Sequence, residues 1–471
     1  MTRLSRATWP GAGGPRPVRA VHLGLGAFHR SHQAWYTHHA ADPEPWGIAA
    51  FTGRSPGAAI PLRDQDGLYT LVERGPERDR TEVVASISAA HDGADGGAWT
   101  GYLASPQVAL VTLTVTEAGY HLDGSGHLDL GHPDVAADIA RLQAAGAQSK
   151  PPPRTMPGRV AAGLAARRRS GAGPITVVPC DNLMGNGAAT RTVVVEMCET
   201  AGRGLADWVL ATVSFASTVV DRITPTTTSD DLSLVERAIG LEDRAAVVTE
   251  PFSEWVLAGD FPAGRPGWES AGARLVADVG PFAERKLCLL NGGHSLLAYA
   301  GSALGHSTVA EAVADPRCRV WLEEWWDGVA PILRLPAGDV TAYRAALLDR
   351  WSNARISHAL SLIARDGSQK LVQRVVPVIR RYRERGEPPP LGAARVVGVW
   401  LAHLRGCGAE ISDPRAAELV ALAAGQPSRA ASALLDALEP GLGEDGPLAR
   451  EVAEACWELE GIAGGRPAAS G

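Results

Sequence analysis

The chain has 471 residues, of which 45% are hydrophobic and 21% charged, a composition typical of globular proteins. Its formal net charge of −7 argues against a nucleic-acid-binding protein, whose usual signature is a basic domain. No run of 18 apolar residues occurs, so we expect no transmembrane helix, and the polar start predicts no signal peptide. The six cysteines form no C-x-x-C pair, which favours reduced thiols and a cytoplasmic location over a disulfide or zinc framework.

Strand-like and helix-like segments alternate in the first half of the chain. Near-continuous apolar runs, as expected of strands buried on both faces, predict strands over residues 18–24, 46–51, 108–120, 175–180 and 211–221. Helical spacing follows the first and the fourth of these runs, over 29–40 and 187–202. This alternation predicts a parallel, doubly wound sheet. Segment 121–158 lacks either pattern, and we expect loops or insertions there.

From about residue 284 the pattern changes to amphipathic or buried helices with few strand signals. Gly280 and Pro281 interrupt the chain just before this change. We therefore predict an α/β fold with two domains, a doubly wound domain over residues 1–280 and a mostly α-helical domain over 281–471.

The first candidate site is a glycine pair, Gly24 and Gly26, between the first predicted strand and the helix after it. Glycines there let the backbone approach a pyrophosphate, and a helix N-terminus favours its negative charge. Because His29 stands at the third glycine position, an ordinary strand–helix turn is an equal alternative. The acid expected after the second strand is missing, and Arg54 could instead meet a ribose 2′-phosphate, stack on adenine or be solvated. NAD and NADP both stay open.

The second candidate site rests on the scarcity of lysine, since only three of the 45 basic residues are lysines. Arginine cannot deprotonate near neutral pH, so a retained lysine points to chemistry that arginine lacks. Lys286, Asn291 and His294 are spaced to face roughly one side of a helix. Alcohol oxidation needs a base and donors for the developing alkoxide, roles that suit a desolvated lysine, an amide and an imidazole. The alternative is a structural role for all of them, in which Asn291 and the two glycines after it break the helix, Lys286 is a surface charge and His294 is a core histidine.

Polar residues also follow two later strands and occupy one later segment. Asn182 and Asp221 come after predicted strands, where ligands bind in open parallel sheets, although an Asx turn explains Asn182 equally. Lys370 and Arg374 are four apart and share a face if the segment is helical. Arg374 could equally pair only with a surface acid. The sequence contains no H-E-x-x-H motif and no Cys/His cluster at ligand spacing, so we predict no metal site.

Seven segments, taken in order, resemble the long-chain polyol dehydrogenase family, the mannitol 2-dehydrogenase and fructuronate reductase (mannonate oxidoreductase) group: GLGAFHRSHQAWY, QDGLYTL, TLTVTEAGY, VVPCDNLMGNG, VVDRITPT, RKLCLLNGGHS and DGSQKLVQR. They run from about residue 20 to 400. The resemblance implies an N-terminal Rossmann-type domain, a mostly helical C-terminal domain, an active site between the two, and metal-independent catalysis by lysine.

The resemblance also implies residue roles. Lys286 matches the family base, Asn182 with Asn291 the oxyanion-binding pair, His294 a substrate-orienting histidine and Lys370 a substrate contact, with Arg374 as its possible partner. We expect the cofactor, NAD with NADP not excluded, to contact these residues: Gly24, Gly26, Phe28, Arg54, Glu117 and Asp221.

Two departures from the family pattern matter. The arginine four positions before Asp366 in mannitol dehydrogenases is Leu362 here, and DGSQKLVQR is more similar to the fructuronate reductase branch. The proton-relay glutamate three positions before the base is replaced by Ala283, with Glu284 adjacent.

The sequence therefore predicts reversible hydride transfer between NAD(H) or NADP(H) and a secondary alcohol of a hexonate or hexitol. We favour mannonate and fructuronate over mannitol and fructose. A non-catalytic nucleotide-binding protein with a decayed site is the alternative from another class. We expect a small-molecule sugar acid or polyol as partner, no nucleic acid or membrane, and a monomer or small homo-oligomer.

Overall fold

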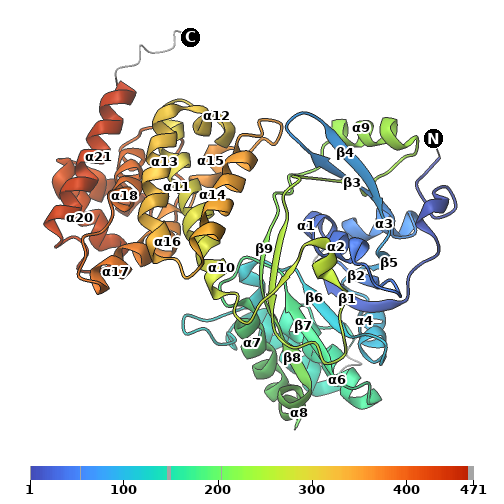
Figure 1. Cartoon of the computed structure of the whole chain (residues 1–471). Helices are drawn as coiled ribbons and strands as arrows, with labels where there is room; N and C mark the ends of the chain where they lie inside the picture. The colour runs from blue at the N-terminus through green and yellow to red at the C-terminus, as the bar shows by residue number, and fades with distance from the viewer. Residues whose placement is uncertain (1, 54, 146–149, 203, 465–471) are drawn as a thin grey trace. The chain divides into compact units, whose positions relative to one another are not determined.

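The computed structural model describes residues 2–53, 55–145, 150–202 and 204–464. The chain divides into two units, Met1–Gly280 (the N-terminal unit) and Pro281–Gly471 (the C-terminal unit), and each is described by itself (Figure 1). Among the described residues, no helix has the length and apolar character needed to cross a membrane.

The N-terminal unit is built on a six-stranded parallel sheet in the order β5-β2-β1-β6-β7-β8. Its strands are β1 (Val18–Leu23), β2 (Gly47–Phe51), β5 (Ile87–His91), β6 (Leu110–Leu113), β7 (Ile175–Pro179) and β8 (Val213–Phe215). The strand order reverses direction between β1 and β6, so the loops after these two strands diverge and leave a crevice at their carboxyl ends, where open sheets bind ligands. The predicted doubly wound, Rossmann-type sheet is confirmed.

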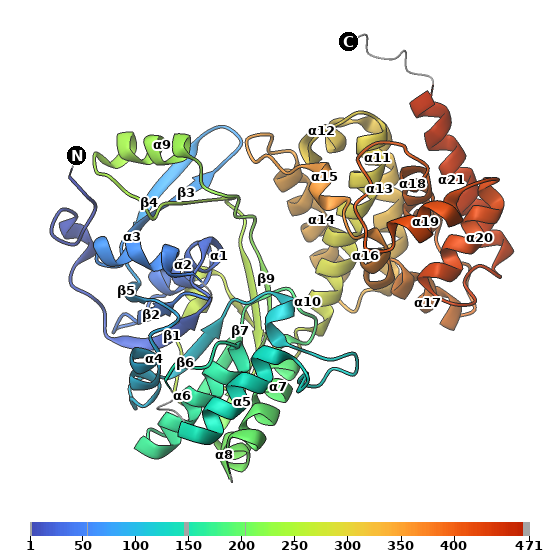
Figure 2. The ribbon, with the colours of Figure 1, turned by 180° about the vertical axis from the view of Figure 1, so that it is seen from behind.

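Both faces of this sheet are covered, which explains the near-continuous apolar runs of its strands. On one face, Val21 and Val111 join a core with side chains of α4, α6 and α7. On the other face, Ala20 and Leu110 join a second core that includes Trp255 of β11. Figures 1 and 2 show α6, α7 and α8 beside the sheet strands.

The helices of the N-terminal unit are η1 (Pro10–Ala12), α1 (Ala27–Ser31), α2 (Gln33–His39), η2 (Pro56–Ala58), α3 (Ala59–Asp64), α4 (Gly96–Leu103), η3 (Glu117–Tyr120), α5 (Pro133–Ala145), α6 (Met156–Ser170), α7 (Asn186–Ala201), α8 (Leu205–Thr212), α9 (Ser229–Ile239) and η5 (Trp268–Ala271).

Two three-stranded sheets complete the N-terminal unit, with the orders β10-β3-β4 and β12-β11-β9. Their strands are β3 (Tyr69–Arg74), β4 (Asp79–Val84), β10 (Val247–Thr249), β9 (Ser217–Asp221), β11 (Glu254–Ala258) and β12 (Arg274–Leu275).

Three predicted segments fold differently. The run 211–221 is the end of α8 followed by two strands in different sheets, because the chain leaves the parallel sheet at Ala216, and hydropathy does not report a change of sheet. The run 108–120 is a strand only over Leu110–Leu113, since the chain turns at the carboxyl edge of the sheet. Segment 121–158 contains α5, which buries Val135 and Leu142. These two residues are seven apart, a stripe too narrow to signal a helix by periodicity.

The C-terminal unit is helical, and its described residues form no strand beyond the isolated bridge between Thr308 and Ala359. The central helix is α18, whose Gly398 lets α21 approach so closely that a Cβ there would lie 2.6 Å from the carbonyl oxygen of Val452. The predicted mostly helical domain is confirmed. Its elements are α10 (Gly280–Arg285), η6 (Lys286–Gly292), α11 (Gly293–Ala303), α12 (Val309–Ala314), α13 (Pro316–Val329), η7 (Ala330–Ile332), α14 (Ala337–Trp351), α15 (Leu360–Ile363), α16 (Gly367–Arg374), α17 (Val376–Glu384), α18 (Leu391–Leu404), α19 (Ala416–Ala423), α20 (Pro427–Leu438) and α21 (Gly446–Gly464).

Candidate functional site

The turn after β1 brings Gly24 against the backbone that follows β6. Gly24 has a φ of 108°, and a Cβ atom there would lie 2.0 Å from the carbonyl oxygen of Thr114. Only glycine fits this position. Gly26 is extended, and its Cβ would meet nothing closer than 3.6 Å. The fold does not require glycine at 26, and close approach of a pyrophosphate is a physical reason for it.

Two buried imidazoles stack below this turn. The ring centroids of His22 and His29 are 3.4 Å apart, and Nδ1 of His22 lies 2.9 Å from Oγ1 of Thr112. Burial lowers the pKa of His22 to about 3 and that of His29 well below 6.5, so both rings are neutral at neutral pH. His29, at the third glycine position of the fingerprint, therefore has a packing role, because its buried ring stacks on His22. Phe28 is half-buried, with its ring 5.0 Å from that of His32.

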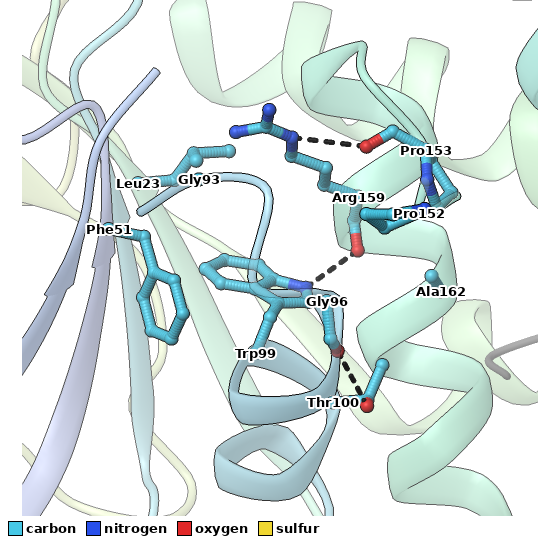
Figure 3. A pocket seen from close by; sticks show the side chains of 10 residues that line it. All are labelled: Leu23, Phe51, Gly93, Gly96, Trp99, Thr100, Pro152, Pro153, Arg159 and Ala162. Carbon is cyan, nitrogen blue, oxygen red and sulfur yellow. Dashed lines mark hydrogen bonds between the residues drawn. The ribbon is translucent and has the colours of Figure 1, made fainter. Parts of the chain in front are cut away.

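A cavity of about 470 Å³ lies beyond the carboxyl ends of β2 and β5, and its lining includes Asp92, Arg154 and Arg159. Arg159 is held in place, since Nε donates to the carbonyl oxygen of Pro153 at 3.2 Å (Figure 3). Its Nη1 donates to the carbonyl oxygen of Thr52, also at 3.2 Å. A fixed guanidinium therefore stands at the end of β2, where dinucleotide-binding sheets recognise the adenosine ribose.

The wall of this cavity is preformed. The buried carboxylate of Asp138 accepts hydrogen bonds from the backbone N–H groups of Arg154 and Thr155, at 2.9 and 2.7 Å. A second, more apolar pocket lies against Phe51 and Trp99 and shares Arg159 with the first (Figure 3). Sequence analysis missed Arg159 because no motif marks it. Arg54 lies outside the described residues.

Glu117 begins the short helix η3 after β6, Asn182 lies in the loop after the adjacent strand β7, and both residues are exposed. A hydrogen bond from the hydroxyl of Tyr120 to the carboxylate of Asp181 joins these two segments. Burial raises the pKa of Asp181 to about 6. A carboxyl that titrates near neutral pH at the ligand-binding edge of the sheet is a functional candidate, which sequence analysis passed over in favour of its neighbour Asn182.

Asp221 ends β9 in the second sheet rather than in the parallel sheet, and it is 7% exposed and paired with Glu254 of β11. The next residue, Arg222, is a structural junction, because its guanidinium donates to the carbonyl oxygen of Ser31 and to Glu73, both at 2.6 Å. Asp221 therefore lies on a strand outside the parallel sheet that carries Gly24 and Asn182.

In the C-terminal unit, Lys286, Asn291 and His294 lie on one continuous helix. This helix changes its hydrogen-bond pattern at Lys286, where α10 passes into the π-helical segment η6, and α11 then continues it. Gly292 and Gly293 have ordinary helical angles, with φ of −64° and −60°. The helix break considered as an alternative therefore does not occur.

The glycine pair has a packing role instead. A Cβ atom on Gly292 would lie 2.6 Å from the indole of Trp325, and one on Gly293 would lie 2.9 Å from the ring of Trp351. These positions accept no side chain without displacing a buried indole.

The π-helical segment decides which residues share a face. In an α-helix, positions five apart differ by about 140° around the axis, so Lys286 and Asn291 would point in different directions. In a π-helix the N–H group of residue i+5 bonds the carbonyl of residue i, so Asn291 stands about one turn above Lys286 on the same side. The common face expected from spacing therefore depends on a π turn that the sequence does not signal.

His294 lies in the first turn of α11 and is 7% exposed. Its ring packs 4.8 Å from that of Trp351 and 4.9 Å from that of His358. His294 Nε2, Trp351 Nε1 and His358 Nδ1 are buried and have no hydrogen-bond partner among the described residues. Buried polar atoms without partners are rare in folded proteins. Three of them at one place indicate a site that binds polar groups.

Basic side chains surround this place. Burial lowers the pKa of His294 well below 6.5, and the nearby His358, Arg350, Arg374 and Lys370 lower it further. His294 is therefore neutral at neutral pH and offers one donor and one acceptor. Arg350 and His358 were not among the candidates, because their positions outside the compared motifs gave no signal.

Lys370 and Arg374 lie on α16, which places them on one face as expected for a helix. Nζ of Lys370 donates to the carbonyl oxygen of Ile363 at 3.0 Å, and burial lowers the pKa of Lys370. Nη1 of Arg374 donates to the carbonyl oxygen of Asn291 at 3.1 Å and to Oγ of Ser295 at 3.0 Å. The structure thus brings α16 against the helix of Lys286.

The DGS motif before Lys370 is fixed by its own packing. Asp366 adopts the left-handed conformation with a φ of 56°, and a Cβ atom on Gly367 would lie 2.6 Å from the hydroxyl of Tyr299. The backbone N–H and Oγ of Ser368 both donate to Asp413 at 2.8 Å. These contacts hold the first turn of α16, and with it the position of Lys370.

The acid next to the missing glutamate is Glu284, which lies on α10. It forms ion pairs with Arg381 at 2.7 Å and Arg334 at 3.5 Å. Positions two apart on an α-helix differ by about 200° around the axis, and this spacing together with the ion pairs argues against Glu284 as a substitute for the missing glutamate. Position 283, one turn before Lys286, carries an alanine.

One group among the described residues has three possible metal ligands within 4.8 Å, namely His38, His39 and Glu82. Nδ1 of His38 accepts a hydrogen bond from the N–H group of Ala85 at 3.2 Å, and Glu82 accepts one from Nε1 of Trp35 at 2.5 Å. These bonds already use two of the ligand groups, so we assign no metal to this cluster.

Comparison with known proteins identifies two family models. The mannitol dehydrogenase Rossmann domain matches residues 18–270, and the mannitol dehydrogenase C-terminal domain matches residues 278–459. D-mannonate oxidoreductase of Escherichia coli strain K12 is 37% identical over 421 residues, which cover 85% of this chain and 84% of that protein. A mannitol 2-dehydrogenase of Pyrenophora tritici-repentis is 36% identical over 429 residues, or 86% of this chain and 74% of that protein.

A solved structure agrees with these matches. The ternary complex of Pseudomonas fluorescens mannitol 2-dehydrogenase with NAD and D-mannitol has a TM-score of 0.79 at 32% identity, and the match covers 98% of each chain. The sequence likeness and the structural likeness both extend over the two units.

Proposed function

The chain belongs to the mannitol dehydrogenase family, and on that premise we propose that it interconverts a secondary alcohol of a hexonate and the corresponding ketone with a nicotinamide cofactor. The favoured pair is mannonate and fructuronate. Mannitol and fructose are the alternative, because a relative named mannonate oxidoreductase and a relative named mannitol 2-dehydrogenase are about equally similar to this chain.

The observation that carries the choice of a hexonate is the charge around His294. Three of the side chains that lower its pKa, Arg350, Arg374 and Lys370, are cations, whereas burial lowers the pKa of the fourth, His358, and leaves that ring neutral at neutral pH. A hexonate carries a carboxylate that a hexitol lacks, and the positive charge of these three side chains favours it, with Lys370 as the group that would bind it. A neutral hexitol gains little from such surroundings.

We assign the chemical roles as follows. Lys286 is the general base that removes the hydroxyl proton during oxidation. The amides of Asn291 and Asn182 donate hydrogen bonds to the developing alkoxide. His294, neutral and with a free Nε2 among the described residues, orients the substrate hydroxyl. Lys370 contacts the substrate, and the carboxylate of the hexonate is its preferred partner.

The N-terminal unit fits a nicotinamide dinucleotide. The tight turn at Gly24 lies at the reversal point of the sheet, and the cavity beside Arg159 lies beyond β2 and β5. When bound, the nicotinamide ring accepts hydride from the alcohol carbon in one direction and supplies it in the other. We propose contacts from Gly24, Gly26, Phe28 and Glu117, and a contact from Arg54, which lies outside the described residues. Asp221 remains in the proposed set, although its place in the second sheet gives it less support.

NAD is the proposed cofactor, with NADP as the alternative. No acid follows β2, and Arg159 is anchored beside Thr52. These features favour acceptance of a 2′-phosphate, whereas Asp92 on the same cavity disfavours it.

We further propose that catalysis is metal-independent, that the protein works in the cytoplasm as a monomer or small homo-oligomer, and that its partner is a small sugar acid or polyol. A non-catalytic nucleotide-binding protein is the second candidate, although retention of Lys286, Asn291 and His294 on one side of a helix argues against it.

The test is a substrate panel. Purified protein is incubated with NADH or NADPH and with fructuronate or fructose, and the absorbance of the reduced coenzyme is followed. Preferred reduction of fructuronate supports the proposal, whereas preferred reduction of fructose assigns a mannitol dehydrogenase. Coenzyme binding without turnover of either ketone, or of mannonate and mannitol in reverse, would favour the non-catalytic candidate.

A further inference from the structure

We propose that Arg374 is a positioning residue, which acts through the backbone carbonyl of Asn291 to set the direction of the Asn291 amide, and is not a substrate contact. The inference rests on the proposed function, in which Asn291 holds the reacting oxygen. The feature behind it is that side chains from two other helices donate hydrogen bonds to the π-helical segment on which Lys286 and Asn291 lie.

Arg374, Ser295 and Asn291 form a closed triangle of hydrogen bonds. Nη1 of Arg374 donates to the carbonyl oxygen of Asn291 at 3.1 Å and to Oγ of Ser295 at 3.0 Å. Oγ of Ser295 donates in turn to the same carbonyl oxygen at 3.3 Å. Ser295 is 1% exposed, so the triangle is well shielded from water. The peptide group that follows Asn291 is thereby held from two sides.

Two indoles hold the preceding part of the same segment. Nε1 of Trp325 donates to the carbonyl oxygen of Cys288 at 2.9 Å, and Nε1 of Trp326 donates to that of Leu289 at 3.0 Å. Both indoles come from α13 and are fully buried. Three hydrogen bonds from outside the helix therefore hold the π turn, at Cys288, Leu289 and Asn291, and Arg374 supplies the last of them.

A π turn needs such support because it is a rare variant of the α-helix. Relaxation toward the α-helical pattern would turn Asn291 away from the side of Lys286. The indole contacts fix the turn up to Leu289, and the Arg374 contact fixes its last part. Loss of Arg374 should therefore displace the Asn291 amide more than the ammonium group of Lys286.

The rival interpretation is that Arg374 binds the substrate carboxylate through its charge. The two interpretations predict different kinetics. Loss of a carboxylate contact raises KM for a carboxylated substrate and spares an uncharged one. Loss of positioning lowers kcat for both substrates by a similar factor, because Asn291 acts on the reacting oxygen in both cases.

The experiment compares Arg374→Met, Ser295→Ala and the matched control Arg380→Met, which removes an arginine of α17 whose guanidinium pairs with Glu439. Each variant is assayed with fructuronate and with fructose, and the isotope effect on kcat is measured with deuterated coenzyme. We expect Arg374→Met to lower kcat by up to about 10²-fold for every ketone that the wild type reduces. A loss of this size is typical when a catalytic group is displaced by about 1 Å. KM should change little, and the isotope effect should rise because hydride transfer becomes rate-limiting.

Ser295→Ala should show part of the same effect, and Arg380→Met none. Arg374→Lys keeps the charge but not the planar guanidinium that places Nη1 between the two acceptors, so it should restore only part of kcat. A selective increase of KM for fructuronate in Arg374→Met, with kcat unchanged, would overturn the inference in favour of carboxylate binding.

Hydrogen exchange gives a readout that does not depend on turnover. Amides within residues 286–296 should exchange faster in Arg374→Met than in the wild type and in Arg380→Met. If the wild type reduces neither ketone, the proposed function fails, while this measurement still decides whether Arg374 holds the π turn. Unchanged exchange in this segment would refute the positioning role.

Discussion

The imidazole of His294 packs 4.8 Å from the indole of Trp351, and each ring carries a buried nitrogen without a hydrogen-bond partner among the described residues. The same surroundings lower the pKa of His294 well below 6.5. Buried polar atoms without partners cost stability, and a polar ligand that formed hydrogen bonds with them would offset that cost.

The depressed pKa of His294 predicts a pH dependence of stability. The unfolded state binds this proton near pH 6.5 and the native state only at much lower pH. Stability is therefore complete above about pH 6.5 and falls as the pH falls. His294→Asn should reduce the loss of the urea midpoint between pH 7.5 and pH 5. His127→Asn is the control, since Glu196 raises the pKa of His127 and its contribution has the opposite sign. An equal acid sensitivity of His294→Asn and the wild type would contradict the burial argument.

Substitution of Lys286 should abolish most of the activity. We expect Lys286→Ala to lower kcat by at least about 10²-fold, the low end for acid–base catalysis. Lys286→Arg should do no better, because guanidinium stays protonated. The measurement is kcat for alcohol oxidation, with Lys150→Ala as the matched control for loss of a lysine. Near-normal turnover of the Arg variant would remove Lys286 from the role of base.

Asn182 and Asn291 should each contribute a donor to the reacting oxygen. Loss of one oxyanion donor costs about 10²–10³ in kcat. Asn182→Asp and Asn291→Asp should be worse than the corresponding Ala variants, because a carboxylate repels the alkoxide. Circular dichroism and coenzyme binding establish that each variant is folded. Full activity of either folded Asp variant would exclude that residue as a donor.

Lys370 should set the preference for a carboxylated substrate. Burial and the nearby Arg374 lower the pKa of Lys370, although Asp366 and Asp413 act in the opposite direction. Lys370→Ala should reduce the preference for fructuronate over fructose by about 1.5–3 kcal/mol, the size of a charged hydrogen bond. The ratio of kcat/KM for the two ketones measures this preference. Equal reduction of both ketones by the wild type would assign the enzyme to the mannitol dehydrogenase activity instead.

Activity should persist after exhaustive chelation. The proposed base is an amine, and the cluster of His38, His39 and Glu82 uses its ligand groups in protein hydrogen bonds. The enzyme is dialysed against EDTA and assayed with and without added divalent ions. Loss of activity that a single divalent ion restores would show that a metal takes part.

Hydropathy and turn residues carried the sequence prediction of the main sheet. The runs that became β1, β2 and β7 are apolar throughout because helices or further strands cover both faces of the sheet. The same logic fails for residues 211–221, where one apolar run supplies strands to two sheets. Hydropathy also gave no prediction of α5, because its buried hydrophobic stripe includes little more than Val135 and Leu142.

Residue identities alone pointed to the chemistry of the candidate site. A lysine retained in a chain rich in arginine, followed by an asparagine and a histidine, indicates a base with two polar partners. A glycine pair after the first strand indicates the dinucleotide, and Gly24 does occupy a turn that excludes a Cβ atom. These inferences are local, because each depends on residue type and on spacing of a few positions.

Only the tertiary structure decided how those residues face one another. With α-helical spacing, Lys286 and Asn291 would point in different directions, and the π turn brings them to the same side of the helix. Hydrogen bonds from the indoles of Trp325 and Trp326 and from Arg374 hold this turn. These donors are 37 to 83 positions away in the chain. No local pattern encodes them, because hydrogen bonds between distant helices form only when the helices pack. Residue types in the sequence indicated the chemistry that we propose, and the packing of α13 and α16 against one helix determined how Lys286 and Asn291 are placed.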